Sequence, residues 1–114
     1  MKIGEIYLVE FPSIDGREQI GFRPAIIVQD ERYIDILPTT LVIPLTSQLK
    51  AQRFPATLLI KSTKENGLEN DSVALIFQLR AIDQKRIKNR LGRVRDKEMV
   101  KIYEYIQNLI KIRI

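Results

Sequence analysis

The chain has 114 residues, of which 45% are hydrophobic, and it contains no cysteine and no histidine. This length suits one domain with its own core, so we expect a single domain over residues 1–114. The missing residue types exclude disulfide bonds, catalytic thiolates, imidazole bases and the usual zinc ligands. Nineteen Lys and Arg against 14 Asp and Glu give a net charge of +5, which favours a polyanionic partner.

No stretch of the chain has the length of a membrane helix. The longest apolar run, residues 73–77, is far below the roughly 20 residues that a spanning helix needs. Glu5 and Glu10 interrupt the N-terminal residues before a targeting segment can form. We therefore expect a soluble, cytoplasmic protein without membrane contact, and the absence of cysteine fits a reducing cytosol.

Short runs rich in β-branched residues fill the first three-quarters of the chain and predict strands. Segments rich in Gly, Pro, Asn, Asp and Ser separate these runs. The spacing predicts a small, strongly bent antiparallel sheet or barrel. The expected strands cover residues 5–11, 24–29, 40–44, 56–61 and 72–80.

The last quarter of the chain switches to helical spacing, which together with the strands predicts an α+β fold. Asp96 is expected to cap a final amphipathic helix with one apolar stripe that packs on the sheet. A shorter helix is expected from Asp83, its cap, to about Asn89, with Ile87 turned inward and Gly92 ending it. The stripe of the final helix consists of Met99, Ile102, Tyr103, Ile106, Leu109 and Ile110.

A proline stands inside each of two strand-like runs, next to polar side chains. Pro24 keeps Arg23 extended, because the residue before a proline is pushed out of the helical region. Pro44 is expected to interrupt strand pairing, so that the polar groups from Thr46 onward emerge where the strand ends. The alternative is that both prolines only protect sheet edges from aggregation. An arginine that faces a hydroxyl is suited to bind a phosphate.

Several linked motifs follow one another along nearly the whole chain. They are GEIYLV at 4–9, EQ at 18–19 with Gly21, RPAIIV at 23–28, IPLTS at 43–47, DSV at 71–73 and QLRAID at 78–83. In this order they resemble the MazF/PemK family of type II toxin-antitoxin endoribonuclease toxins. The serial agreement carries the resemblance, since each motif alone is weak.

The resemblance implies a fold, an activity and partners. The expected fold is a small SH3-like antiparallel β-barrel with a short helix and a C-terminal amphipathic helix, assembled as a homodimer. The expected activity is that of an mRNA interferase, a sequence-specific endoribonuclease that cleaves single-stranded RNA without metal or cofactor. Attack by the 2′-hydroxyl would leave 2′,3′-cyclic phosphate and 5′-hydroxyl ends, and a cognate antitoxin would hold the toxin inactive.

Matched by position, the resemblance makes Arg23 and Thr46 the catalytic residues. The chemistry of these side chains agrees, because a permanently charged guanidinium offers bidentate donors to phosphoryl oxygens and a hydroxyl adds another hydrogen bond. Neither is a good base, so Glu18 is the expected base if its loop closes over the substrate. The expected RNA-binding residues are Gln19, Gly21, Phe22, Ser47, Gln48, Lys50, Arg53, Gln78 and Arg80.

Several of these RNA-binding roles have structural alternatives. The amide and hydroxyl side chains are suited to base edges, whereas Phe22 and Phe54 would stack on bases or pack in the core. Lys50 and Arg53 would attract phosphates or remain solvated. Arg80 would line the RNA groove or pair with a nearby carboxylate.

Two apolar residues depart from one branch of the family. Leu75 and Phe77 stand where some members have an arginine and an acidic residue, so an acid/base pair cannot operate there. Two other functions therefore remain in view. A CcdB-like gyrase inhibitor shares the barrel and dimer but has no reason to keep the Arg23 and Thr46 pair, and a catalytically silent RNA-binding module fits the two departures.

Overall fold

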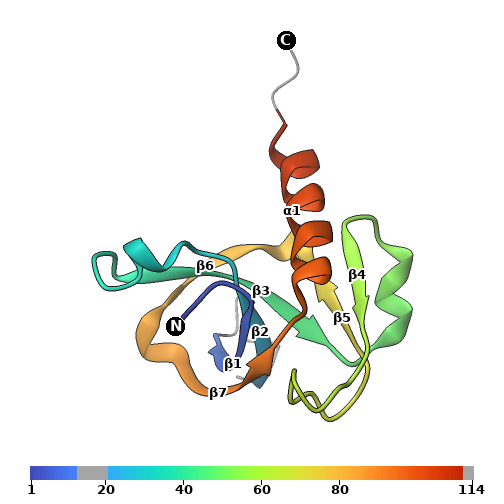
Figure 1. Ribbon diagram of the computed structural model, residues 1–114, viewed down its shortest axis with the longest axis horizontal. Helices are drawn as coiled ribbons and strands as arrows, with labels where there is room; N and C mark the ends of the chain where they lie inside the picture. Colours follow the sequence, from blue (N-terminus) through green and yellow to red (C-terminus); the bar gives the residue numbers. More distant parts are fainter. Residues whose placement is uncertain (13–20, 112–114) are drawn as a thin grey trace.

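The structure is a computed structural model that describes residues 1–12 and 21–111. In this part of the chain a seven-stranded antiparallel sheet and one C-terminal helix are joined by short 3₁₀ turns (Figure 1). The strands predicted at residues 5–11, 24–29, 40–44 and 56–61 are confirmed, with small shifts of their ends. The elements are β1 (Glu5–Phe11), β2 (Gly21–Ile27), β3 (Thr39–Thr46), β4 (Thr57–Ile60), β5 (Ser72–Leu75), β6 (Arg80–Asp83), β7 (Ile87–Arg93) and α1 (Asp96–Ile110).

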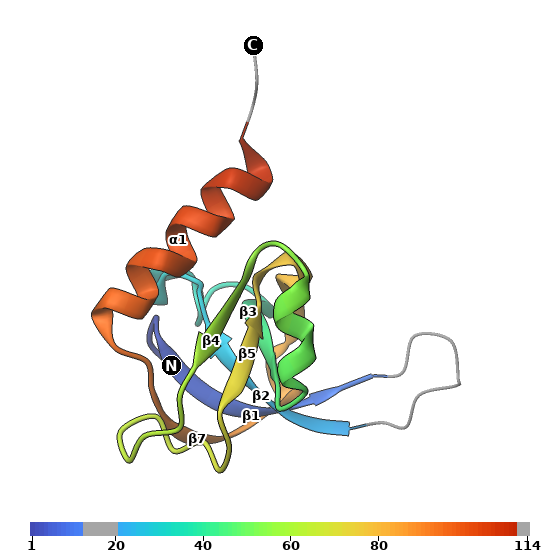
Figure 2. The same cartoon turned by 90° about the vertical axis from the view of Figure 1, so that its right-hand side faces the viewer.

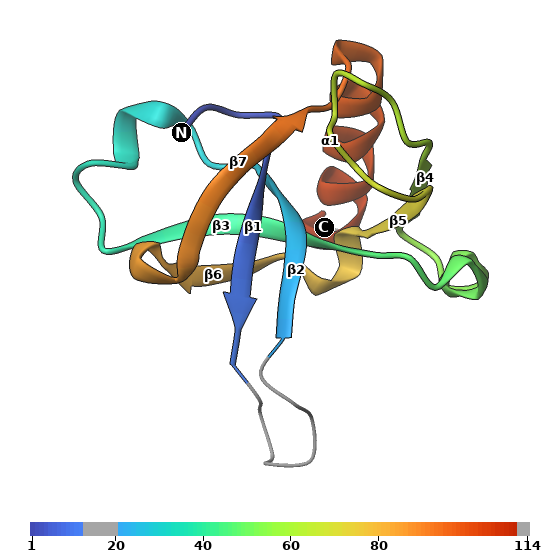
Figure 3. The same cartoon turned by 90° about the horizontal axis from the view of Figure 1, so that it is seen from below.

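Strand β3 is the centre of the sheet, because it pairs with three other strands. β2 pairs along one edge, while β6 and then β5 pair along the other, in the overall order β4-β5-β3-β2-β1-β7. Figure 3 shows β1, β2 and β7 running steeply across β3 and β6, so the sheet is strongly bent as predicted. A pairing of β4 with β7, which would close a barrel, is not among the strand pairs of residues 1–12 and 21–111.

Both faces of the bent sheet are buried, which explains the continuous apolar runs in β2 and β3. Neighbouring residues alternate between two core clusters, since side chains of a strand point to opposite faces. Ile26 and Ile43 belong to the cluster that packs against α1, and Ile27 and Val42 belong to the cluster on the other face. The alternation fixes the register of β2 on β3, because a slip by one residue would exchange the two faces.

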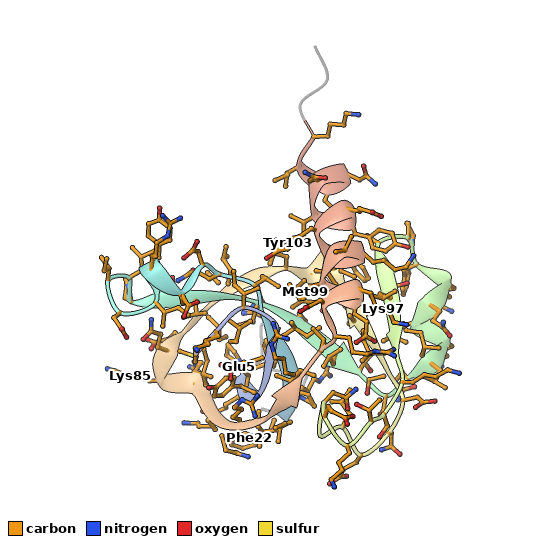
Figure 4. All side chains as sticks on the ribbon, viewed as in Figure 1. Glu5, Phe22, Lys85, Lys97, Met99 and Tyr103 are labelled. Carbon is orange, nitrogen blue, oxygen red and sulfur yellow. The ribbon has the colours of Figure 1, made fainter. Side chains whose placement is uncertain are left out.

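Helix α1 contacts the core with its residues up to Ile106 and not with its last turn. Met99 and Ile102 are buried in the core, and Ile106 is partly buried beside them. The prediction that the whole apolar stripe packs on the sheet is wrong for the other three residues. Tyr103, Leu109 and Ile110 are 43%, 47% and 69% exposed. Figure 2 shows why: the helix runs past the sheet, so its C-terminal turns have no strand beneath them. In Figure 4, Met99 lies at the sheet end of the helix.

The start of α1 also differs from the prediction in one detail. Arg95 is the N-cap and Asp96 is the first helical residue. Glu98 accepts a hydrogen bond from the Arg95 backbone N–H at 2.9 Å, which satisfies one of the free donors at the helix start.

Two predicted elements are wrong in type. The run at 72–80 is not one strand, because the 3₁₀ turn Ile76–Gln78 separates β5 from β6. The predicted helix from Asp83 is a 3₁₀ turn, Gln84–Arg86, followed by strand β7. Asp83 does act as a cap, since its side chain accepts from the Lys85 N–H at 2.9 Å. Gly92 lies inside β7 and does not end a helix.

An ion pair between Glu5 and Arg90 joins β1 to the edge strand β7. The Glu5 carboxylate is only 13% exposed and also accepts a hydrogen bond from the Lys2 backbone N–H at 2.6 Å. Burial raises the pKa of Glu5, but the hydrogen bonds from Arg90 and Lys2 and the charge of Arg90 outweigh it, so the pKa lies below its ordinary value.

Glu5→Gln is expected to destabilise the fold at neutral pH but not in acid. Because the folded-state pKa is depressed, the charged carboxylate stabilises the fold above its ordinary pKa of about 4.3, and this contribution is lost as the pH falls through the lower folded value. Urea unfolding at pH 7 should give a loss of about 1 kcal/mol for Glu5→Gln, which shrinks as the pH falls below the ordinary pKa of the carboxyl and through its lower folded-state value. Glu31→Gln, at an exposed carboxyl, is the control. A loss for Glu5→Gln that stays the same as the pH falls would contradict this role.

Candidate active site

The strand register brings Arg23 and Thr46 to the same end of two neighbouring strands. Ala25 of β2 pairs with Pro44 of β3. Arg23 lies two residues before Ala25, and Thr46 lies two residues after Pro44. Because the strands are antiparallel, both residues lie toward the same end of the pair. Strand pairing does change at Pro44, as expected. The pairing of β3 with β2 ends at this residue, and the pairing of β3 with β5 begins at the next one, Leu45. The two polar side chains therefore emerge where β2 and β3 separate.

Arg23 and Thr46 line a common pocket of about 510 Å³, a volume typical of small-ligand sites. We call it the Arg23 pocket. Its polar lining consists of Arg23, Thr46, Ser47, Gln48, Glu69, Asn70 and Ser72. Its apolar lining consists of Leu8, Phe22, Pro24, Leu45, Leu68 and Leu91.

The hydrogen-bonding state of both side chains leaves donors for an anion. The Thr46 hydroxyl oxygen accepts a bond from the Gln48 backbone N–H at 3.2 Å, so its proton remains to be donated. Arg23 has no ion-pair partner in the part of the chain that the structure describes. Five other arginines there are paired with carboxylates, namely Arg32, Arg86, Arg90, Arg93 and Arg95. Arg23 is thus an exposed guanidinium in a pocket, as a phosphate site requires.

The loop at residues 61–71, which joins β4 to β5, also lines the pocket, through Gly67, Leu68, Glu69 and Asn70. Buried Asn66 organises this loop: its amide donates to the Lys61 carbonyl at 2.8 Å, and its oxygen accepts from the N–H groups of Thr63 and Leu68 at 3.0 Å. Figure 2 shows the loop beside β7. Its position is therefore set by internal hydrogen bonds and by contact with the edge strand.

Two glycines allow the loop and β7 to approach closely. Gly67 has a φ of +67° and lies against the backbone of Leu91, and Gly92 lies against the backbone of Asn66. A Cβ on either glycine would come closer than 3.0 Å to backbone atoms of the other segment. This backbone-to-backbone contact holds the loop wall at the pocket.

Sequence reasoning missed three polar residues of the pocket: Glu69 and Asn70 of the loop and Ser72 at the start of β5. Ser72 is buried and donates to the Asn70 carbonyl at 3.0 Å, whereas Glu69 and Asn70 are exposed. The available signal was the cluster of polar residues at 69–72 directly before a buried strand. That signal indicates a loop but not the pocket it faces.

The predicted RNA-binding residues and the predicted base Glu18 fall into three groups. Phe22, Ser47 and Gln48 line the pocket, and Phe22 is 56% exposed at the start of β2, on the side of the molecule away from α1 (Figure 4). Glu18 and Gln19 lie outside the described residues. The structure does not place the other five at the pocket, namely Gly21, Lys50, Arg53, Gln78 and Arg80.

Aromatic rings hold two of the predicted cationic side chains. The Arg53 guanidinium lies 4.9 Å from the ring centre of Phe54, which in turn packs against Phe77 with 5.5 Å between ring centres. Arg80 lies 5.5 Å from the ring centre of Phe11, so among the described residues its partner is an aromatic ring and not a carboxylate. Phe54 and Phe77 are 44% and 40% exposed, so neither is a core residue.

Two further findings concern the described residues as a whole. Residues 1–12 and 21–111 contain no group of three or more acidic side chains placed to hold a metal ion. None of the helices in this part of the chain combines the length and apolarity needed to cross a membrane.

Comparison with known proteins identifies the family. A model of the family described as PemK-like, MazF-like toxins of type II toxin-antitoxin systems matches residues 2–110. The chain belongs to this family. The family predicted from the linked motifs is therefore confirmed, and the match covers every element from β1 to α1.

Two relatives agree with this assignment at the level of sequence. The endoribonuclease EndoA of Bacillus subtilis is 32% identical over 107 residues, which cover 94% of this chain and 91% of the relative. The endoribonuclease MazF of Staphylococcus saprophyticus is 32% identical over 102 residues, covering 90% and 84%.

Solved structures of the MazF family share the fold. A MazE-MazF structure from Deinococcus radiodurans superposes with a TM-score of 0.80 at 20% identity, covering 99% of this chain and 97% of that one. The Mycobacterium tuberculosis toxin MazF-mt6 superposes with a TM-score of 0.76 at 17% identity, covering 96% and 99%. The mostly antiparallel sheet with one C-terminal helix is thus a MazF fold.

Proposed function

We propose that this MazF-family toxin is a metal-independent endoribonuclease that cuts single-stranded RNA in the Arg23 pocket. The observation that carries the proposal is the presence of Arg23 and Thr46 in one pocket, with an unpaired guanidinium and a free hydroxyl proton among the described residues. The 32% identity to the endoribonucleases EndoA and MazF supports it.

The proposed reaction is a transesterification within the RNA. The 2′-oxygen bonds to phosphorus while the bond from phosphorus to the 5′-oxygen breaks, which leaves a 2′,3′-cyclic phosphate and a 5′-hydroxyl. Arg23 and Thr46 donate hydrogen bonds to the phosphoryl oxygens, where negative charge grows in the transition state. The 2′-hydroxyl loses its proton to a base, for which Glu18 stays our prediction, and the departing 5′-oxygen gains a proton.

The partners follow from the family and from charge. Solved relatives include an endoribonuclease in complex with its cognate antitoxin, and we propose an antitoxin and a homodimer for this chain as well. The net charge of +5 supports binding of RNA and of an acidic antitoxin segment. A closed SH3-like barrel and a cytoplasmic location belong to the same proposal.

Incubation of the purified protein with a long single-stranded RNA in EDTA tests the function. We expect discrete fragments with cyclic phosphate and 5′-hydroxyl ends, because neither the nucleophile nor the charge stabilisation requires a metal. Cleavage that occurs only with added metal, or different chemical ends, would contradict the mechanism. Binding of RNA without cutting would support a silent RNA-binding module, and inhibition of DNA supercoiling without RNA cleavage would support a gyrase inhibitor.

A further inference from the structure

Among the described lining residues of the Arg23 pocket, Glu69 is the only one with a carboxylate. It is exposed and has no hydrogen-bond or ion-pair partner among residues 1–12 and 21–111. The neighbouring Asp71 differs, because its carboxylate accepts from the Ser62 backbone N–H at 2.8 Å and so closes the loop. Glu69 is thus not needed to hold the loop together.

A carboxylate in a phosphate-binding pocket needs an explanation. It repels the substrate's phosphates and weakens binding unless a hydrogen-bond donor of the substrate faces it. RNA offers such donors on its bases, since adenine, cytosine and guanine each carry an exocyclic amino group. Uracil presents carbonyl oxygens at the equivalent positions, and these oxygens repel a carboxylate.

The donors of the pocket and its carboxylate come from different elements of the fold. Arg23 and Thr46 enter from β2 and β3, whereas Glu69 enters on the loop that packs against Leu91 of β7. Apolar side chains of Phe22 and Leu68 also line the pocket, and such surfaces accept the faces of a sugar and a base. A nucleotide held by its phosphate at Arg23 would therefore direct its base toward the loop.

The loop has the rigidity that base recognition requires. Asn66 fixes it by three side-chain hydrogen bonds, and Gly67 and Gly92 fix its distance from β7. Buried Leu68 anchors the residue directly before Glu69. The backbone at Glu69 is thus held at a defined place, so its exposed side chain extends from a fixed point of the pocket wall, next to the exposed residue Asn70.

From this arrangement we infer that Glu69 selects the base next to the cut phosphate: it accepts a hydrogen bond from an exocyclic amino group and rejects uracil. The inference rests on the proposed function and adds a specificity role for the loop at residues 61–71. The side-chain NH₂ group of Asn70 can donate a hydrogen bond to the acceptor that lies beside the amino group on the edge of the same base. One good contact between a side chain and a base edge discriminates by about tenfold to a hundredfold.

Cleavage of an RNA pool with randomised sequence tests the inference. Wild type, Glu69→Gln and the control Glu65→Gln are compared in EDTA, and fragment ends are sequenced. Glu65 is exposed on the same loop but does not line the pocket. Wild type and Glu65→Gln should avoid uracil at one position beside the cut, and Glu69→Gln should reduce this avoidance about tenfold or more at that position alone.

Two outcomes would overturn the inference while leaving the proposed function intact. One is an unchanged base profile in Glu69→Gln. The other is slower cleavage at all sites with the same profile, which would make Glu69 a general base or a structural residue.

A binding measurement does not depend on cleavage. The ¹⁵N-labelled protein is titrated with AMP, CMP, GMP and UMP, of which CMP and UMP differ by the amino group alone. UMP should bind at least tenfold more weakly than the best amino-bearing nucleotide, and Glu69→Gln should remove this difference. Absence of cleavage by wild type would refute the proposed function, whereas equal binding of all four nucleotides would refute the inference.

Discussion

Arg23→Ala is expected to slow RNA cleavage by about a hundredfold to a thousandfold, the usual effect of removing one preorganised donor from a site of developing negative charge. Arg23 is the guanidinium that lines the pocket, and the described residues hold no other charged donor there. In the variant, water would have to stabilise the growing charge in place of the guanidinium. Water does this less well, because its molecules must reorient as the charge grows, whereas Arg23 is already in position. The measurement is single-turnover cleavage of one RNA by wild type and variant.

Two controls separate catalysis from folding and from charge. Arg32→Ala removes an exposed arginine that is paired with Asp30 outside the pocket, and it should cleave like wild type. Arg23→Lys keeps the charge but loses the bidentate geometry, so its rate should fall between those of wild type and Arg23→Ala. The melting temperature of Arg23→Ala should not change, since this side chain is exposed. Undiminished cutting by Arg23→Ala would remove the basis of the proposed mechanism.

The predicted strands succeeded where local pattern and burial agree. β1 was predicted at residues 5–11, and the structure gives the same bounds. Its apolar residues indicate a strand, and nearby turn residues mark where the strand begins and ends. β2 and β3 were recognised as apolar runs, and their burial on both faces explains those runs. In these segments no distant partner was needed to infer the strand.

The failures occurred where distant partners decide the structure. Residues 72–80 read as one strand, but β3 pairs with β5 and β6 in succession, and the chain turns at Ile76–Gln78 between them. β7 was missed because the residues from Asp83 to about Asn89 read as a short helix with Asp83 as its cap. Its strand conformation depends on pairing with β1, which the local sequence does not encode. The stripe of α1 was overextended for a similar reason, since the sheet ends before the helix does.

The same division applies to the candidate site. Arg23 and Thr46 were predicted from motifs at the ends of strands and from the family resemblance, and the register of β2 on β3 brings them to one pocket. Glu69 was not found, because its place depends on the contact of its loop with β7. Neither the Asn66 hydrogen bonds nor the close approach of Gly67 to Leu91 is visible in a linear pattern.

That loop contact leads to the second large effect. Gly92→Ala is expected to lower the free energy of unfolding by about 3 kcal/mol, the upper part of the range for overpacked sites. The new Cβ would lie less than 3.0 Å from the backbone of Glu65 and Asn66, and backbone atoms cannot move aside as a flexible side chain does. For a domain of about this size the melting temperature should fall by roughly 10 °C or more.

The relief of this clash would also change the pocket. The loop must move away from β7, and Glu69 and Asn70 move with it, so Gly92→Ala should lose base discrimination at a temperature at which it is still folded. Asn89→Ala, at an exposed position of the same strand, is the control and should retain both stability and discrimination. If Gly92→Ala were as stable and as selective as wild type, the loop would not be held by its contact with β7. The pocket wall would then have to be positioned by hydrogen bonds within the loop, such as those of Asn66 and the one from Ser62 to Asp71.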